Sequence, residues 1–217
     1  MFKQRQRRRV SRWLALIRVA RARDIPALVE TLSHAFDADP VLSWVIRGDG
    51  KRPVALRRLF TFILKEGVPH GEVAATDELD ACAVWVPPGV WAEPPGLLES
   101  LRMLPETLRW TGLGRLRRFM EMDTAEHERR PRTPHYYLAI LGVLPRRQRT
   151  GLGSALLGHT LGRLDEEGMP AYLESSNPAN VPFYERHGFR AVDKIRLSGG
   201  GPSELCMWRE PRAPVGS

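Results

Sequence analysis

The segment from 135 to 167 constrains the fold of this chain more than any other part of the sequence. A strand is predicted at 135–144 (HYYLAILGVL), whose nearly continuous apolar character is typical of a central strand covered on both faces. Gly142 inside this run indicates a bulge or a close approach of another backbone. Polar residues follow, then Gly151 and Gly153, and then a helical pattern. This strand, loop and helix, with a further strand behind them, predict an α/β domain with a mixed central sheet.

Hydrophobic periodicity and turn residues locate the other elements. Strands are predicted at 14–20, 71–76, 80–86, 171–175, 191–197 and 204–209. Helices are predicted at 26–36, 52–67, 96–110, 113–128, 151–167 and 181–187. Asp24 has the character of an N-cap, and Asp39-Pro40 is expected to end the first helix. The short acidic turn between the second and third strands predicts an antiparallel hairpin.

The length of the chain fits one domain. Its 217 residues are enough for one well-buried α/β core and few for two. We expect a basic tail without fixed structure at 1–13, a single domain at 14–211 and a short C-terminal tail at 212–217. No apolar run approaches the ~18 residues that span a bilayer, and the run at 13–17 is too short for a signal-peptide core. We therefore expect a cytoplasmic protein without a membrane partner.

The positive charge is concentrated at the N-terminus. The formal net charge is +8, yet residues 1–23 hold nine basic side chains and no acidic one. The rest of the chain holds 24 basic and 25 acidic residues, so the folded domain is close to neutral. The run Arg7-Arg8-Arg9 leaves RNA, DNA or anionic lipid open as a partner of the tail. The alternatives are a solvated tail or a start codon assigned too early, and nucleic acid is otherwise not expected as a partner.

The two cysteines, Cys82 and Cys206, both lie in apolar stretches. We expect two reduced thiols in the core, because the positions of the cysteines fit no metal-ligand spacing. No metal is therefore expected in the site.

The loop after the strong strand has the chemistry of an anion site. A helix N-terminus offers unpaired N–H groups and a partial positive charge, and glycines let a ligand approach the backbone. Three arginines, at 146, 147 and 149, surround the glycines, so the loop suits a pyrophosphate. A P-loop is excluded because no Lys follows the glycines, and a dinucleotide turn is disfavoured because Leu156 stands where a third glycine is needed. On the loop alone, a turn that only joins strand and helix stays open.

Two motifs resemble the hallmarks of the GNAT superfamily of N-acetyltransferases. Residues 148–153 (QRTGLG) match its Gln/Arg-x-x-Gly-x-Gly/Ala signature, and they lie between a strand and a helix as that family requires. Residues 177–189 (NPANVPFYERHGF) match its later Asn-x-x-x-x-x-Phe/Leu-Tyr-x-x-x-Gly-Phe segment. The likeness is closer still to puromycin N-acetyltransferase-like members. It is dense from 137 to 189 and lapses across 91–133, where helices that shape the acceptor pocket are expected.

The resemblance implies the GNAT fold, with a mixed and mostly antiparallel central sheet of about six or seven strands flanked by helices. It also implies acetyl-CoA as the co-substrate. The backbone of Leu141, Gly142 and Val143 is expected to pair with the pantetheine arm as a false strand, which would explain a bulge at Gly142. Asn177 and Asn180 are expected to contact the pantetheine arm, although Asn180 could serve only as a helix cap. The residues expected to hold the pyrophosphate are Gln148, Arg149, Thr150, Gly151, Leu152, Gly153 and Ser154.

Tyr184 is the candidate general acid and Glu174 the candidate base. A phenol with a pKa near ~10 is protonated at neutral pH and can donate its proton to the leaving thiolate. Glu174 ends a strand beside the expected cleft, where a carboxylate could also hold an ammonium group before its deprotonation. A core role for Tyr184 and a structural role for Glu174 stay open. His135 is a weaker candidate base, because at the start of a strand it is expected to be solvated.

The acceptor is expected to be the primary amine of a small molecule, antibiotic-like or aminoacyl, that attacks acetyl-CoA directly in a ternary complex. Acetylation of protein lysines or N-termini is an alternative, and so is a non-catalytic acyl-CoA-binding module. A homodimer stays open. The tryptophans at 44, 85, 91 and 110 are interpreted as core residues, with the lining of an acceptor pocket as the alternative.

Overall fold

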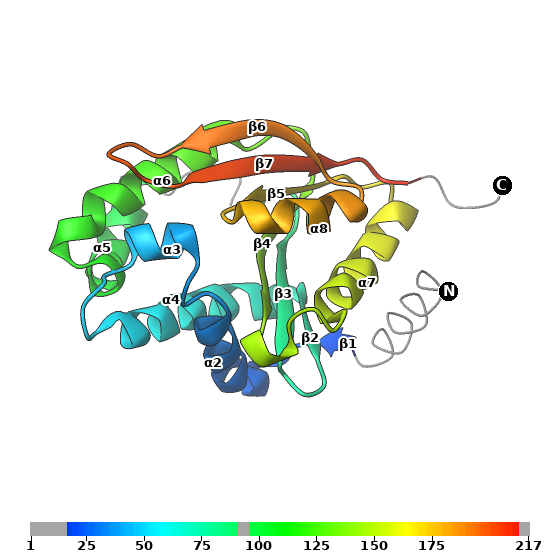
Figure 1. The fold of residues 1–217 in the computed structure, drawn as a ribbon, viewed down its shortest axis with the longest axis horizontal. Helices are drawn as coiled ribbons and strands as arrows, with labels where there is room; N and C mark the ends of the chain where they lie inside the picture. The colour runs from blue at the N-terminus through cyan, green and yellow to red at the C-terminus, as the bar shows by residue number, and fades with distance from the viewer. Residues whose placement is uncertain (1–16, 91–95, 213–217) are drawn as a thin grey trace.

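One mixed sheet of seven strands organises the described residues, 17–90 and 96–212, of this computed structural model. The strand order is β1-β2-β3-β4-β5-β7-β6 (Figure 1). All neighbouring strands are antiparallel except β4 and β5. The mixed, mostly antiparallel sheet that we predicted is therefore confirmed. The strands are β1 Ile17–Val19, β2 Val73–Thr76, β3 Ala81–Val86, β4 Tyr136–Val143, β5 Ala171–Ser175, β6 Arg190–Arg196 and β7 Ser203–Arg209.

Helices flank the sheet on both faces. The α-helices of the described residues are α2 Ile25–Ala35, α3 Pro40–Val45, α4 Arg52–Gly67, α5 Leu97–Thr111, α6 Leu116–Arg129, α7 Leu152–Glu166 and α8 Val181–Arg186. The short 3-10 turns are η1 Ala22–Asp24, η2 Val68–His70, η3 Leu113–Arg115, η4 Pro145–Arg147 and η5 Pro178–Asn180. The basic tail at 1–13, Trp91 and residues 213–217 lie outside the described residues.

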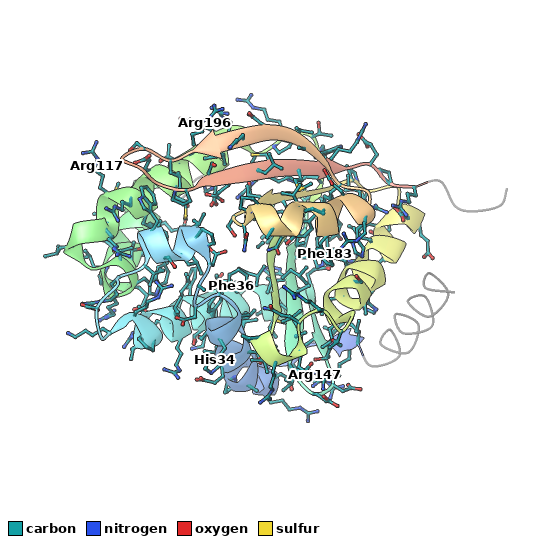
Figure 2. The ribbon with its side chains drawn as sticks, in the orientation of Figure 1. His34, Phe36, Arg117, Arg147, Phe183 and Arg196 are labelled. Atoms are coloured by element: carbon teal, nitrogen blue, oxygen red, sulfur yellow. The ribbon has the colours of Figure 1, made fainter. Side chains whose placement is uncertain are left out.

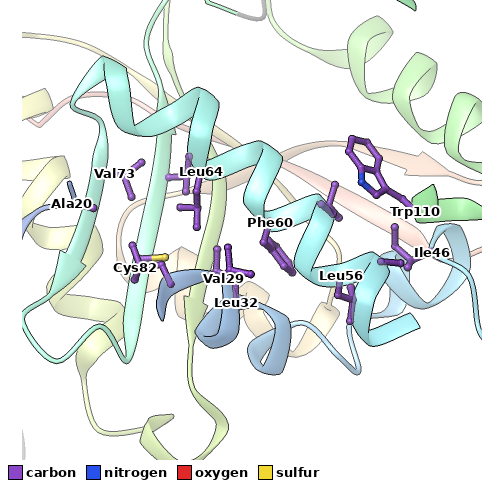
Figure 3. Close-up of a cluster of buried hydrophobic side chains, with 14 of the residues drawn as sticks. Ala20, Val29, Leu32, Ile46, Leu56, Phe60, Leu64, Val73, Cys82 and Trp110 are labelled. Atoms are coloured by element: carbon purple, nitrogen blue, oxygen red, sulfur yellow. The ribbon is translucent and has the colours of Figure 1, made fainter. Parts of the chain in front are cut away.

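One face of the sheet is covered by α2, α4 and α6. On the β2–β4 half, Leu32 and Phe60 pack with Cys82 in a buried apolar cluster (Figure 3). On the other half, α6 covers a second cluster that contains Tyr172 and Cys206. Both cysteines are buried and free, as expected for core thiols.

The opposite face is covered by α7 and α8, which pack on Trp85, Leu138 and Leu173. Because β4 has apolar neighbours on both faces, its sequence is apolar at nearly every position instead of alternating.

A short helix that the sequence analysis did not predict follows α2. Asp39-Pro40 was expected only to end a helix, but the same residues begin α3. The Asp39 carboxylate accepts the Leu42 N–H at 2.9 Å, and Pro40 occupies the first turn, where its missing N–H costs nothing. The pair therefore marks the boundary between two helices.

Asp24 occupies the N-cap position of α2, as predicted, but its carboxylate bonds backward along the chain. It accepts the Arg21 N–H at 2.8 Å and pairs with Arg18 at 2.6 Å. The carboxylate therefore joins the start of α2 to β1.

The connection from β4 through α7 to β5 places the functional segments together. Parallel strands need a crossover, and here the crossover is a helix. The start of α7 therefore lies at the carboxyl end of β4, and η5 and α8 follow the carboxyl end of β5 (Figure 1). In open α/β sheets, this end of neighbouring parallel strands is where ligands bind.

Candidate active site

Strands β4 and β5 separate soon after they begin. They pair only at Tyr136 with Ala171 and at Tyr137 with Tyr172. On its other side, β4 stays paired with β3 as far as Val143. Among the described residues, no strand pairs with β4 on the β5 side beyond Tyr137, so the edge of its second half is open. An open strand edge presents backbone N–H and C=O groups to an extended ligand.

A bulge lies where β4 turns away from β5. Val84 of β3 pairs with Ile140, but the next residue, Trp85, pairs with Leu138. Ala139 is therefore the extra residue on β4. A bulge bends its strand and increases its twist, which accounts for the divergence.

Our expectation of a bulge at Gly142 is wrong, because Gly142 pairs regularly with Cys82. Glycine is required at position 142 for a different physical reason. A Cβ at this position would overlap the Leu32 side chain of α2 and would lie 3.2 Å from Phe36. The alternative interpretation was the close approach of another backbone, but the atoms that require glycine here are side-chain atoms of α2 and of Phe36 after it.

The loop from β4 to α7 leaves the first turn of the helix uncapped. No side chain of the described residues caps α7, whose N-cap is Gly151 at φ 102°. Arg149 is also in the left-handed region, at φ 61°. The first N–H of α7 that bonds back to the N-cap is that of Ala155, which donates to the Gly151 carbonyl at 3.0 Å. The N–H groups before it are the unpaired donors of a helix start, at the positive end of the helix dipole.

Two side chains hold the loop in shape. Gln148 donates from Nε2 to the Val143 carbonyl at 3.2 Å, and Thr150 donates to the Arg147 carbonyl at 2.7 Å. In this structure both side chains therefore support the loop, whereas the backbone of the helix start faces outward.

The three arginines near the loop do not have one role. Arg147 pairs with Asp80 at 2.8 Å and with Glu78 at 3.3 Å, which joins the loop to the β2–β3 turn. Figure 2 labels Arg147 at this end of the molecule. Arg146 and Arg149 are exposed. The predicted cluster of three arginines thus reduces to two that are available to an anion.

The two asparagines after β5 differ in their contacts. Asn177 accepts the Ala179 N–H at 3.0 Å and so caps η5. Asn180 occupies the N-cap position of α8, but its side chain makes no capping bond and is exposed. The Asn180 side chain therefore does not cap α8, and its exposed amide is available to a ligand. Asn177 is the asparagine that caps a helix here, and that helix is η5.

Tyr184 lies in α8 and is 9% exposed. Its ring packs edge-on against Phe183 and Phe189. Phe183 in turn reaches toward Gly153 at the start of α7 (Figure 2). Burial raises the pKa of Tyr184, and the negative charge of Asp39 adds to the shift. The phenol therefore stays protonated at neutral pH, as a general acid must.

Asp39 connects the two sides of the opening. Its carboxylate caps α3 and also accepts a hydrogen bond from the Ser176 hydroxyl, directly after β5. The negative charge of Asp39 raises the pKa of both Tyr184 and Glu204. Asp39 was missed as a site residue because Asp-Pro has the ordinary signature of a helix boundary.

Glu174 lies on the α6 face of the sheet near the point where β4 and β5 diverge. Burial raises the pKa of Glu174, and Arg130 opposes the shift. The hydroxyls of Tyr137 and Tyr172 act in the same direction as Arg130. Within the part of the chain that the structure describes, however, neither carboxylate oxygen of Glu174 has a partner in hydrogen-bonding geometry. A carboxylate with a raised pKa is a better proton acceptor for an ammonium group.

His135 is buried, so our expectation of a solvated side chain is wrong. It is 9% exposed, its Nδ1 lies 2.7 Å from the Thr133 carbonyl oxygen, and its ring packs between Tyr172 and Trp208. Burial lowers the pKa of His135. It lies directly before the paired start of β4, away from the ends where β4 and β5 diverge.

The tryptophans are mainly core residues. Trp85 and Trp110 are at most 2% exposed within the apolar clusters. Trp44 is partly buried and lies under the Arg118 guanidinium at 5.3 Å from the ring centre.

Two surface depressions lie away from the diverging strands. One is beside Glu72 and Arg163, and the other is beside Arg57 and Thr61. No predicted site residue lines either of them. Within the described ranges, no group of three or more His, Cys, Asp or Glu side chains is arranged to hold a metal ion. A search of the same residues finds no helix with the length and apolar character needed to cross a membrane.

Comparison with known proteins gives one matching family model. Residues 106–189 match the model of the Acetyltransferase (GNAT) family. The match spans both motifs up to Phe189 and includes β4, the glycine loop, α7, β5 and α8.

Similar whole proteins agree with that match. An uncharacterized N-acetyltransferase of Schizosaccharomyces pombe, C550.08, is 28% identical over 201 residues, which cover 88% of this chain and 81% of the relative. A structure described as histone acetyltransferase HPA2 and related acetyltransferase, from Corynebacterium glutamicum, is 25% identical with a TM-score of 0.68, and covers 92% of this chain and 98% of its own. Mosquito arylalkylamine N-acetyltransferase like 5b is 17% identical, with a TM-score of 0.59 and coverage of 89% and 98%, and shares the fold.

Proposed function

We propose that this chain, whose family-model match and similar proteins support membership of the GNAT superfamily, transfers an acetyl group from acetyl-CoA to the primary amine of a small molecule. The reaction is a direct attack within a ternary complex. Tyr184 is the general acid, and Glu174 receives the proton of the amine.

The observation that carries the proposal is the open edge of β4 beside the uncapped start of α7. An extended pantetheine arm can pair with the backbone from Leu141 to Val143 as a strand would, where β5 has turned away. The pyrophosphate then lies on the N–H groups of the first turn of α7, through Gly151, Gly153 and Ser154. The exposed amide of Asn180 reaches the arm from the other side.

The chemistry requires one proton to leave the nitrogen and one to reach the sulfur. The neutral amine attacks the thioester carbonyl carbon, so that a C–N bond forms while the C–S bond breaks. The Tyr184 phenol donates its proton to the leaving thiolate, and its raised pKa lets it recover a proton afterward. The acetylated amine and free coenzyme A are the products.

Glu174 prepares the amine for attack. A primary ammonium group is protonated at neutral pH and must lose a proton before it can act as a nucleophile. Because burial raises the pKa of Glu174, its carboxylate first attracts the ammonium group and then accepts its proton.

A small-molecule acceptor is supported by two observations. The segment from 137 to 189 resembles puromycin N-acetyltransferase-like members, which favours an antibiotic-like or aminoacyl amine. Mosquito arylalkylamine N-acetyltransferase like 5b, which is named for a small amine, shares the fold over 89% of this chain.

A second candidate is acetylation of protein lysines. The observation in its favour is the 25% identity to a structure described as a histone acetyltransferase. Mass spectrometry of a proteome incubated with the protein and labelled acetyl-CoA separates the two candidates, since a protein acetyltransferase labels lysines that a small-molecule enzyme leaves unlabelled.

The test of the first candidate is thiol release from acetyl-CoA by the full chain, measured with puromycin and a panel of primary amines. We expect amine-dependent thiol release together with an acetylated amine of the corresponding mass. If the protein binds coenzyme A but releases no thiol with any amine or protein, it is an acyl-CoA-binding module and the catalytic proposal is wrong.

A further inference from the structure

Three carboxylates gather under α6, on the face of the sheet that holds Glu174. Cys206 of β7 pairs with Glu174, so both side chains point to the same face. Glu204 stands two residues before Cys206 and therefore shares that face as well. Glu126 of α6 belongs to the same group, because it interacts with both Glu174 and Glu204 and because α6 packs on the cluster that contains Tyr172 and Cys206.

The group is short of positive charge. Glu204 is 3% exposed, and its Oε1 has no hydrogen-bond partner in the described residues. Both oxygens of Glu174 are equally without one. Among the described residues, Arg130 is the cation whose charge acts on Glu126 and Glu174, and its guanidinium lies 4.3 Å from the centre of the Tyr137 ring. Buried carboxylates are normally paired with cations, so this group of three is a favourable place for a further positive charge.

The pKa directions agree with this geometry. Burial raises the pKa of Glu126, and the charges of Glu174 and Glu204 add to the shift. Burial likewise raises the pKa of Glu204 to about 8, with contributions from Glu174 and Asp39. The charge of Glu174 therefore acts on both Glu126 and Glu204, and a cation bound between these two would favour their ionised forms.

The group is continuous with the proposed reaction centre. Glu174 lies where β4 and β5 diverge, and Asp39 acts on both Tyr184 and Glu204. A residue diagonal to another across antiparallel strands has its Cα about 7–8 Å away, so Glu204 lies about that far from Glu174. Two side chains on one face at this Cα separation can be reached by the two ends of one short alkyl chain.

We propose that the acceptor is a dication, with one ammonium group held by Glu174 for acetylation and a second cationic group held between Glu204 and Glu126. The inference rests on the proposed function, because it assigns the substrate class of that same site. It does not follow from the carboxylates alone, since Glu204 is 3% exposed and its buried Oε1 has no hydrogen-bond partner among the described residues.

The experiment compares three amines of the same length with the wild-type chain and acetyl-CoA: putrescine, butylamine and γ-aminobutyrate. Putrescine should exceed butylamine in kcat/KM by about tenfold or more, the size expected of one charge-assisted contact. γ-Aminobutyrate, whose far end is negative, should be the poorest of the three. Equal kcat/KM values for putrescine and butylamine would overturn the inference and leave the acetyltransferase proposal standing.

Two variants test whether Glu204 binds the second cationic group of the acceptor. Glu204→Gln should lower kcat/KM for putrescine far more than for butylamine, so that the ratio falls toward one. Glu128→Gln makes the same chemical change on α6 at an exposed residue and should keep the wild-type ratio within about twofold. An unchanged ratio in Glu204→Gln would assign the carboxylates a structural role and contradict the inference.

A binding measurement keeps the inference testable without turnover. In the presence of coenzyme A, putrescine should raise the thermal midpoint of the wild-type chain more than butylamine at equal concentration. If no amine is acetylated but this difference is present, the dication site stands and the catalytic proposal fails. If putrescine and butylamine give the same shift, the dication site is wrong.

Discussion

Gly142 lies directly against the Leu32 side chain, so the central strand and the first full helix meet without room for a methyl group. The contact fixes α2 on β4 at the level where β4 has its open edge. The position of α2, and of the Phe36 ring that follows it, therefore depends on the absence of a side chain at one residue of the strand.

Gly142→Ala should destabilise the protein by about 1–3 kcal/mol, because overpacking a buried contact forces Leu32 or α2 to move. Chemical denaturation measures the change in the free energy of unfolding. Gly158→Ala is the matched control: this residue lies in α7, and a Cβ there would meet nothing within 4 Å. The control should stabilise the protein by about 0.5–1 kcal/mol. Equal effects of the two substitutions would rule out the packing explanation.

Tyr184→Phe should lower kcat by about a hundredfold or more while leaving the affinity for coenzyme A within about threefold, because it removes only the proton donor. Single-turnover thiol release and calorimetric binding of coenzyme A measure the two quantities. Tyr136→Phe is the control, since Tyr136 pairs with Ala171 at the start of β4. An activity of Tyr184→Phe close to wild type would remove Tyr184 from the mechanism.

The sequence was most informative where the structural cause is local. The apolar run of β4, the glycine loop and the helix after it were all predicted, because a doubly covered strand and a helix start depend on neighbouring residues. The sequence alone did not reveal why residue 142 is glycine. Glycine alone does not distinguish a bulge from a close approach, and the helix that approaches lies more than a hundred positions earlier in the chain.

The acceptor side could not be predicted, because its residues come together only in three dimensions. Glu126 belongs to an amphipathic helix in which a glutamate is normally solvated, and this helix falls in the segment where the resemblance lapses. Glu204 is the second residue of a strand near the end of the chain. Glu174 was the candidate that the sequence offered, but the β5–β7 register that places Glu204 on its face was not known.

Glu204 should contribute a fall in stability as the pH rises from about 4.5 to about 8, opposed by His135 and His187, whose pKa values are lowered by burial. The pKa of Glu204 is raised to about 8, so between these values the folded state holds a proton that the unfolded state has released. Glu126 and Glu174 shift in the same direction, whereas Arg130 opposes them. Urea denaturation at intervals across this range measures the slope.

Glu204→Gln should make this slope shallower, because it removes one of the titrating groups and weakens the shifts of the other two. Glu128→Gln, exposed on α6, should retain the wild-type slope. If Glu204→Gln leaves the wild-type slope unchanged, Glu204 is ionised in the folded protein and its predicted contribution is wrong.

Substitutions of Arg147 and Arg149 should affect different properties, the free energy of unfolding and the affinity for coenzyme A respectively. Arg147 pairs with Asp80, whose side chain is 7% exposed, so Arg147→Met leaves a buried carboxylate with less compensation. We expect it to cost about 1–3 kcal/mol in the free energy of unfolding, with a change of no more than about threefold in the affinity for coenzyme A. Arg149→Met should have the reverse pattern, because the Arg149 side chain is exposed beside the uncapped start of α7. Thermal denaturation and calorimetric titration with coenzyme A measure both quantities on the same samples. If Arg147→Met weakens coenzyme A binding as much as Arg149→Met does, Arg147 belongs to the anion site despite its pairing with Asp80.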